Sequence, residues 1–282
     1  MTSIATNSPL PKSQQWYRPT FSPEHGVYVM LLVSFLTGAA AAQHWTWGTT
    51  LALISGFCGF QGEHPLIWQI KQRKSLKPRL LLWGSLYGGV AIAISPLARR
   101  GAIALWLLWQ NTTKLPLLLI YTGAIAALIF DIVSVWHRQQ KSRLNELVTF
   151  AAVCLSAPLA YTITSGTIDK IAISLWVLNS LFFSSAIFTV KLRKTKTASI
   201  IPGIIFHGMA TAIAVALCLT GWLSLITASA FGVALIKFTL ILWQKNWYCT
   251  AKIQQVALLE TLSSLAFLII VALSVLPVVI SH

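Results

Sequence analysis

The chain contains only six acidic residues, and most of them lie in or next to long apolar segments. Two of them occur in similar four-residue patterns, Pro-Glu-His-Gly at 23–26 and Gly-Glu-His-Pro at 62–65. A carboxylate beside an imidazole can take part in general acid–base catalysis or bind a polar ligand group. Because ionisable side chains are costly at bilayer depth, proteins usually keep them there for a function.

Asp131 and Glu260 also interrupt apolar runs. A buried charge needs a partner, so we expect Asp131 to pair with Arg143 or His137. Glu260 has no partner close in the sequence and must find one on another helix. The candidate catalytic residues are therefore Glu63, His64, Asp131 and Glu260.

A second group of polar residues suits ligand binding. It comprises the first Glu-His pair, the start of the basic run at 71–79 and the segment Arg-Leu-Asn-Glu at 143–146. The candidate binding residues are Glu24, His25, Lys71, Arg73, Arg143, Asn145 and Glu146. A purely structural interpretation stays open for part of this set, because acidic side chains also favour the N-terminus of a helix.

The composition predicts the elements that position these residues. Hydrophobic residues make up 56% of the chain, charged residues only 10%, and the mean hydropathy is +0.73. Soluble domains carry about a quarter charged residues, so this chain cannot build a water-facing surface. We predict an all-α, polytopic transmembrane helix bundle in a lipid bilayer. It forms one domain, 23–282, after a polar, disordered cytosolic tail at 1–22.

A helix needs about twenty largely apolar residues to cross a bilayer. About nine segments meet this requirement, and they are 25–44, 48–70, 80–98, 115–136, 146–165, 170–190, 199–219, 222–243 and 255–278. The apolar segment at 101–110 is too short to span. With the polar residues that follow it, to position 113, it is expected to form an interfacial or re-entrant helix.

The basic residues predict the orientation. If the N-terminus is cytosolic, the inner segments hold sixteen lysines and arginines and the outer segments hold four. The positive-inside rule then favours N-in and C-out, and it places every acidic residue except Asp169 at the cytosolic face. The net charge of +15 is explained by these loops, which argues against nucleic-acid binding. The plasma (inner) membrane is the default location, and an internal membrane remains open.

The segment Pro-Glu-His-Gly-Val-Tyr-Val-Met at 23–30 resembles the opening motif of the YwiC-like family of bacterial membrane proteins. Arg-Leu-Asn-Glu-Leu at 143–147, and Lys252 followed by Glu260 in the last span, also fit that family. Tyr28 stands where the family pattern has tryptophan, and Gln255 where it has glycine. The resemblance implies a multi-pass membrane protein and no particular reaction.

The predicted architecture is also similar to that of the UbiA-type prenyltransferases, which hold Mg²⁺ and a prenyl diphosphate with two aspartate-rich motifs. The first of these positions here offers Glu63, His64 and the basic run at 71–79, but the second, 191–196, has no carboxylate. Magnesium prefers oxygen ligands such as carboxylates. We therefore predict no metal ligand, and the cofactor stays unassigned.

Three functions remain open. The first is an enzyme or lipid-handling protein that takes a lipid-soluble or anionic small molecule at a polar cytosolic site. The second is a proton- or cation-coupled transporter. The third is a non-catalytic membrane assembly partner whose inner charges form structural pairs, with protein partners unknown. The chain has no P-loop, zincin or hydrolase-elbow motif to favour those enzyme classes.

Overall fold

The computed structural model describes residues 19–22, 24–73, 76–94, 115–193 and 199–276, and these form helices without any strand. The helices are α1 (His25–Ala42), α2 (Trp47–Gln72), α3 (Pro78–Ile94), α5 (Leu115–Trp136), α6 (Arg143–Val153), α7 (Ser156–Ser165), α8 (Lys170–Lys191), α9 (Ile201–Leu219), α10 (Leu225–Ser229), α11 (Gly232–Trp243), α12 (Lys245–Thr250) and α13 (Ile253–Val275). The expected segment at 101–113 and nearly all of the expected tail lie outside the described residues.

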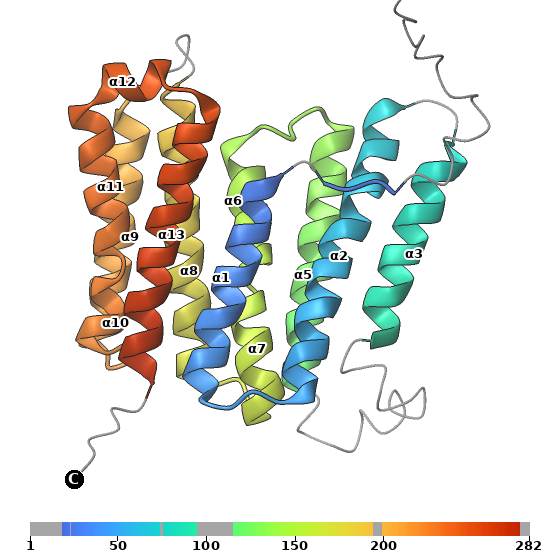
Figure 1. Cartoon of the computed structure of the whole chain (residues 1–282), viewed down its shortest axis with the longest axis horizontal. Coiled ribbons are helices and arrows are strands. Elements are labelled where there is room, and N and C mark those ends of the chain that lie inside the picture. The colour runs from blue at the N-terminus through green and yellow to red at the C-terminus, as the bar shows by residue number, and fades with distance from the viewer. Residues whose placement is uncertain (1–18, 23, 74–75, 95–114, 194–198, 277–282) are drawn as a thin grey trace, which may run out of the picture.

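Seven stretches of the described chain are long and apolar enough to cross a membrane. They are His25–Ala42, Leu115–Trp136, Arg143–Ser165, Lys170–Lys191, Ile201–Leu219, Leu225–Trp243 and Ile253–Val275. The sequence predicted nine. The two others are α2, which carries polar Gln61, Glu63 and His64 in its second half, and α3, which is 17 residues long. Both run alongside the seven in the same bundle (Figure 1).

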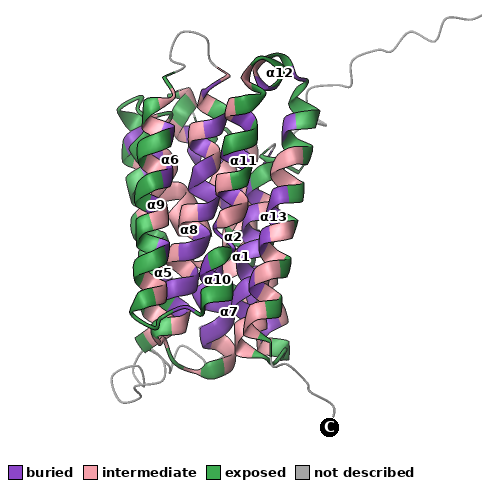
Figure 2. Cartoon of the chain, turned by 90° about the vertical axis from the view of Figure 1, so that its left-hand side faces the viewer, coloured by how far each residue is buried: buried purple, intermediate pink, exposed green. Residues whose placement is uncertain are grey.

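The outer faces of the bundle carry many exposed residues (Figure 2), and large apolar side chains are common among them. Large exposed apolar side chains repeat along α5, α9 and α13, among them Leu119, Ile125, Ile129, Ile204, Ile205, Met209, Leu258, Leu262 and Ile269. In water such faces would form large hydrophobic patches, which soluble monomers rarely expose. In a bilayer they meet lipid tails, so the chain is an integral membrane protein.

Two of the predicted spans are broken helices. The span expected at 146–165 consists of α6 and α7, with the break at Cys154 and Leu155. Pro158 has no N–H to donate to the carbonyl of Cys154, which instead accepts from the N–H of Ala157 at 3.0 Å. Gly38 of α1 packs against this break so closely that a Cβ would lie 2.0 Å from the carbonyl oxygen of Ala157. The span expected at 222–243 is likewise divided into α10 and α11.

Helix α8 packs against α13 on one side and against α1 on the other. Phe182 of α8 stacks on Phe267 of α13 at 4.1 Å between ring centroids, inside the largest apolar cluster. The Asn179 side chain of α8 donates a 2.9 Å hydrogen bond to the hydroxyl of Thr37 on α1. The starts of α1, α3, α6, α9 and α13 and the ends of α2, α5, α8 and α11 meet at the upper end of the bundle in Figure 1.

Candidate functional site

A cavity of about 830 Å³ lies at the upper end of the bundle, between α1, α2, α5, α6 and α8. Four of the five acidic residues that the sequence placed at one face line it together with His64, and these four are Glu24, Glu63, Asp131 and Glu146. Its apolar wall contains Phe21, Val27, Phe60, Ile67, Trp68, Phe150, Ile187 and Val190. The cavity therefore combines a hydrocarbon surface with a concentration of carboxylates.

Helix α2 contributes a stripe of side chains to this cavity. Phe60, Glu63, Ile67 and Lys71 follow one another at intervals of three or four residues, which places them on one face of the helix. Gly62 lets α3 approach, because a Cβ there would lie 3.0 Å from the backbone nitrogen of Gly88. The second Glu-His pattern thus holds α2 against α3 while its carboxylate lines the cavity.

Asp131 on α5 is bound by Asn145 on α6. The Asn145 side-chain amide donates to Oδ1 of Asp131 at 2.6 Å, and the two residues are only 3% and 6% exposed, Asn145 being the more buried. Ser142 fixes the start of α6 by accepting from the backbone N–H of Asn145 at 3.2 Å. This cap places Asn145 one turn inside the helix, within reach of α5.

The expected ion pair of Asp131 with Arg143 or His137 is wrong. Both basic residues are exposed, and among the described residues neither forms a salt bridge with Asp131. Arg143 begins α6 at the polar end of the bundle and is exposed, whereas Asp131 is buried. A neutral amide therefore takes the place that a cation was expected to fill.

The charges around the cavity are unevenly partnered. Glu63 lies close enough to Asp131 and Glu24 for their like charges to interact, and no salt bridge to these three carboxylates forms among the described residues. Glu146 is paired with Lys191 at the end of α8. The other lysines at the cavity, Lys71 and Lys141, are exposed.

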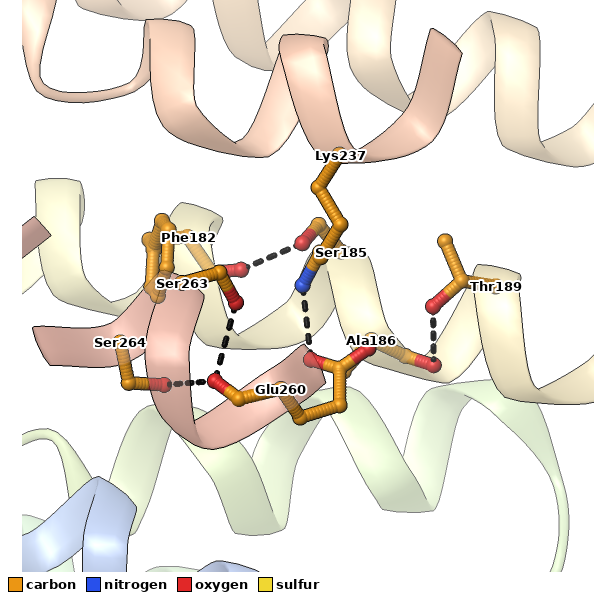
Figure 3. A network of polar contacts seen from close by, with 8 residues as sticks. All are labelled: Phe182, Ser185, Ala186, Thr189, Lys237, Glu260, Ser263 and Ser264. Carbon is orange, nitrogen blue, oxygen red and sulfur yellow. Dashed lines mark hydrogen bonds and ion pairs between the residues drawn. The ribbon is translucent and has the colours of Figure 1, made fainter. Parts of the chain in front are cut away.

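Glu260, the fourth candidate catalytic residue, lies elsewhere. Its carboxylate accepts a 2.7 Å hydrogen bond from Lys237 of α11, and its backbone carbonyl accepts from the hydroxyls of Ser263 and Ser264 (Figure 3). Lys237 is 3% exposed and also lies 5.4 Å from the ring of Phe182. The predicted partner on another helix is confirmed, and Glu260 is not among the residues that line the cavity.

Tyr248, on the short helix α12 beside this pair, is fully buried. Burial, reinforced by the nearby charge of Glu260, raises the pKa of Tyr248 to about 12. The tyrosine is therefore a neutral hydroxyl at physiological pH.

Three candidate binding residues are absent from the cavity lining, namely His25, Arg73 and Arg143. Arg73 donates to the backbone carbonyl of Trp136 and lies 5.5 Å from its ring, so it ties the end of α2 to the end of α5. Sequence reasoning missed the contribution of α8, including Lys191. The sequence signal for it is a lysine in the last turn of an apolar helix, a feature that also supports the predicted orientation.

Within the described ranges, no three His, Cys, Asp or Glu side chains lie close enough together to hold a metal ion. The arrangement instead offers carboxylates and an imidazole that can accept and donate protons, at the end of an apolar chamber. It can hold an amphipathic molecule with its polar group against the carboxylates.

A comparison with protein-family models matches residues 21–161 to the model described as YwiC-like protein. This range contains both Glu-His patterns, Asp131 and the Ser142–Asn145 cap, and it supplies the cavity residues of α1, α2, α5 and α6. No curated protein and no solved structure matches the chain. Because the family model covers half of the chain, including most of the cavity wall, the protein belongs to the YwiC-like family.

Proposed function

We propose that this membrane protein binds a lipid-soluble, amphipathic small molecule in the cavity, with Glu63, Asp131 and His64 as acid–base groups. The observation that supports this most is the convergence of four carboxylates and His64 from different helices on one chamber of about 830 Å³. Ligand sites typically have volumes of about 300–1,000 Å³, apolar walls and a few convergent polar groups.

The proposal includes an orientation. With the N-terminus in the cytosol and α2 and α3 counted as spans, the chain crosses the membrane nine times, and the cavity lies at the cytosolic end. The exposed Lys71 and Lys141 then lie near the headgroups of the inner leaflet, where anionic lipids attract basic side chains. The plasma membrane is the proposed location.

A second candidate function is a proton- or cation-coupled transporter. It is favoured by Glu24, Glu63 and Asp131, since none of the three has a salt bridge among the described residues. Against it, the residues that line the cavity all belong to the upper end of the bundle. The assembly-partner alternative is favoured only by Glu146 and Glu260, which are individually paired with lysines.

Labelling with a lipid-soluble carbodiimide, which attacks protonated carboxyl groups, tests the proposal in protein reconstituted into nanodiscs. We expect Glu63 and Asp131 to be modified, and an organic extract of the host membrane to slow that modification. Asp169, at the opposite end of the bundle, is the internal control, because it caps α8 and accepts from Tyr161 at 2.7 Å. Equal labelling and equal protection of all three carboxylates would show that the cavity binds nothing selectively.

A further inference from the structure

The inner wall of the cavity is rich in hydrogen-bond acceptors. Asn145 directs its side-chain amide group to Oδ1 of Asp131 at 2.6 Å and to the backbone carbonyl of Gln140 at 3.1 Å. Its remaining polar atom, Oδ1, is buried and has no hydrogen-bond donor among the described residues. Buried acceptors without a donor are rare in native proteins because leaving them unpaired is costly.

The carboxylates on this side of the cavity also lack basic partners in the part of the chain that the structure describes. Glu63 interacts with the like charges of Asp131 and Glu24, and among the described residues none of the three forms a salt bridge. The basic groups nearby do not compensate them, since Lys191 pairs with Glu146. The remaining lysines that line the cavity are exposed. The like charges of these carboxylates repel one another, and a cation bound among them would relieve that repulsion.

We infer that the polar group of the cavity's ligand is a protonated amine, held by Glu63, Asp131 and the free oxygen of Asn145. An ammonium group supplies both things that this wall lacks, because it carries a positive charge and three hydrogen-bond donors. The hydrocarbon part of the ligand would lie on Phe60, Trp68 and Phe150. This inference rests on the proposed function and replaces the anionic ligand that the basic run at 71–79 suggested.

Three single-chain probes with the same tail separate the alternatives: dodecylammonium, dodecyl phosphate and dodecanol. Each is titrated by calorimetry into the protein in phosphatidylcholine nanodiscs, with empty nanodiscs subtracted. We expect saturable binding of dodecylammonium, at least tenfold tighter than that of dodecanol. Asp131→Asn and Glu63→Gln should each weaken it at least tenfold. Asp169→Asn should not, because asparagine still caps α8.

Glu63→Gln keeps the test valid if Asp131→Asn fails to fold, because Glu63 makes no hydrogen bond with the described residues that the change would break. Tight binding of dodecyl phosphate alone, with protection of the cavity carboxylates from carbodiimide, would overturn the cation and leave the binding cavity intact. Unchanged dodecylammonium binding in both variants would also overturn it. If no probe binds and the carbodiimide does not distinguish Glu63 from Asp169, the proposed function fails as well.

Discussion

Breaking the pair between Lys237 and Glu260 should destabilise the bundle unequally, depending on which partner is removed. Removing one member of a buried ion pair costs about 3–5 kcal/mol, since the other charge stays buried without compensation. Glu260→Gln leaves Lys237, which is 3% exposed, whereas Lys237→Met leaves a glutamate side chain that is 24% exposed. We therefore expect about 4 kcal/mol for Glu260→Gln and about 3 kcal/mol for Lys237→Met, within the range for such pairs.

The double variant Lys237→Met/Glu260→Gln removes both charges and should cost only about 1 kcal/mol, because replacing a whole buried pair by uncharged groups is often nearly neutral. Reversible unfolding in mixed detergent micelles gives the free energy of unfolding of all four proteins. The reasoning is refuted if the two single effects add in the double variant, or if Lys237→Met is the more damaging change. Binding of dodecylammonium to the double variant should match the wild type, since neither residue lines the cavity.

Three further outcomes follow from the packing and the proposed topology. Gly38→Ala should lower the free energy of unfolding by about 3 kcal/mol, because overpacking costs about 1–3 kcal/mol and the new Cβ meets the backbone at Ala157. Gly208→Ala, with nothing within 4 Å of the added Cβ, should instead raise it by about 1 kcal/mol, and equal effects would contradict the packing. Ser142→Ala should lower the free energy of unfolding by about 1 kcal/mol, because α6 loses its N-cap, and it should weaken the hydrogen bond between Asn145 and Asp131. Ser142→Asp should restore the stability, because aspartate also caps helices well. A reporter fused to the N-terminus should be active in the cytosol and one fused to the C-terminus outside it, and the reverse pattern would refute the orientation.

Most of the fold could be predicted because its signals are local. Long apolar runs separated by basic loops indicate the helices and their order, and the boundaries agree within a few residues at α1, α5 and α8. The breaks inside α6–α7 and α10–α11 were not predicted. The first has a local signal in Pro158, which has no N–H to donate to the carbonyl of Cys154. The close packing of Gly38 against this break depends on a helix distant in the sequence and was not evident.

Local signals in the sequence predicted part of the candidate site, and the contacts between helices determine the rest. The position of each acidic residue within its span, and the antiparallel order of the spans, were enough to bring four carboxylates to one end. The partners of these charges were not evident, because they depend on how the helices are rotated about their own axes. Asp131 lies against an asparagine instead of the arginine two residues before it, and Glu260 turns to Lys237 on α11.

Helix α8 lies between the cavity, where Glu146 is paired with Lys191 and Glu63 and Asp131 have no salt bridge among the described residues, and the pair of Lys237 and Glu260. One face, with Ile187, Val190 and Lys191, closes the cavity, while the other carries Phe182 next to the buried pair of α11 and α13 (Figure 3). Carboxylates that serve packing can be neutralised within the protein, as Glu260 is by its lysine. A carboxylate kept for a ligand must instead leave its counter-charge to that ligand. The absence of a basic partner for Asp131 and Glu63 among the described residues is therefore the property that separates them from Glu260.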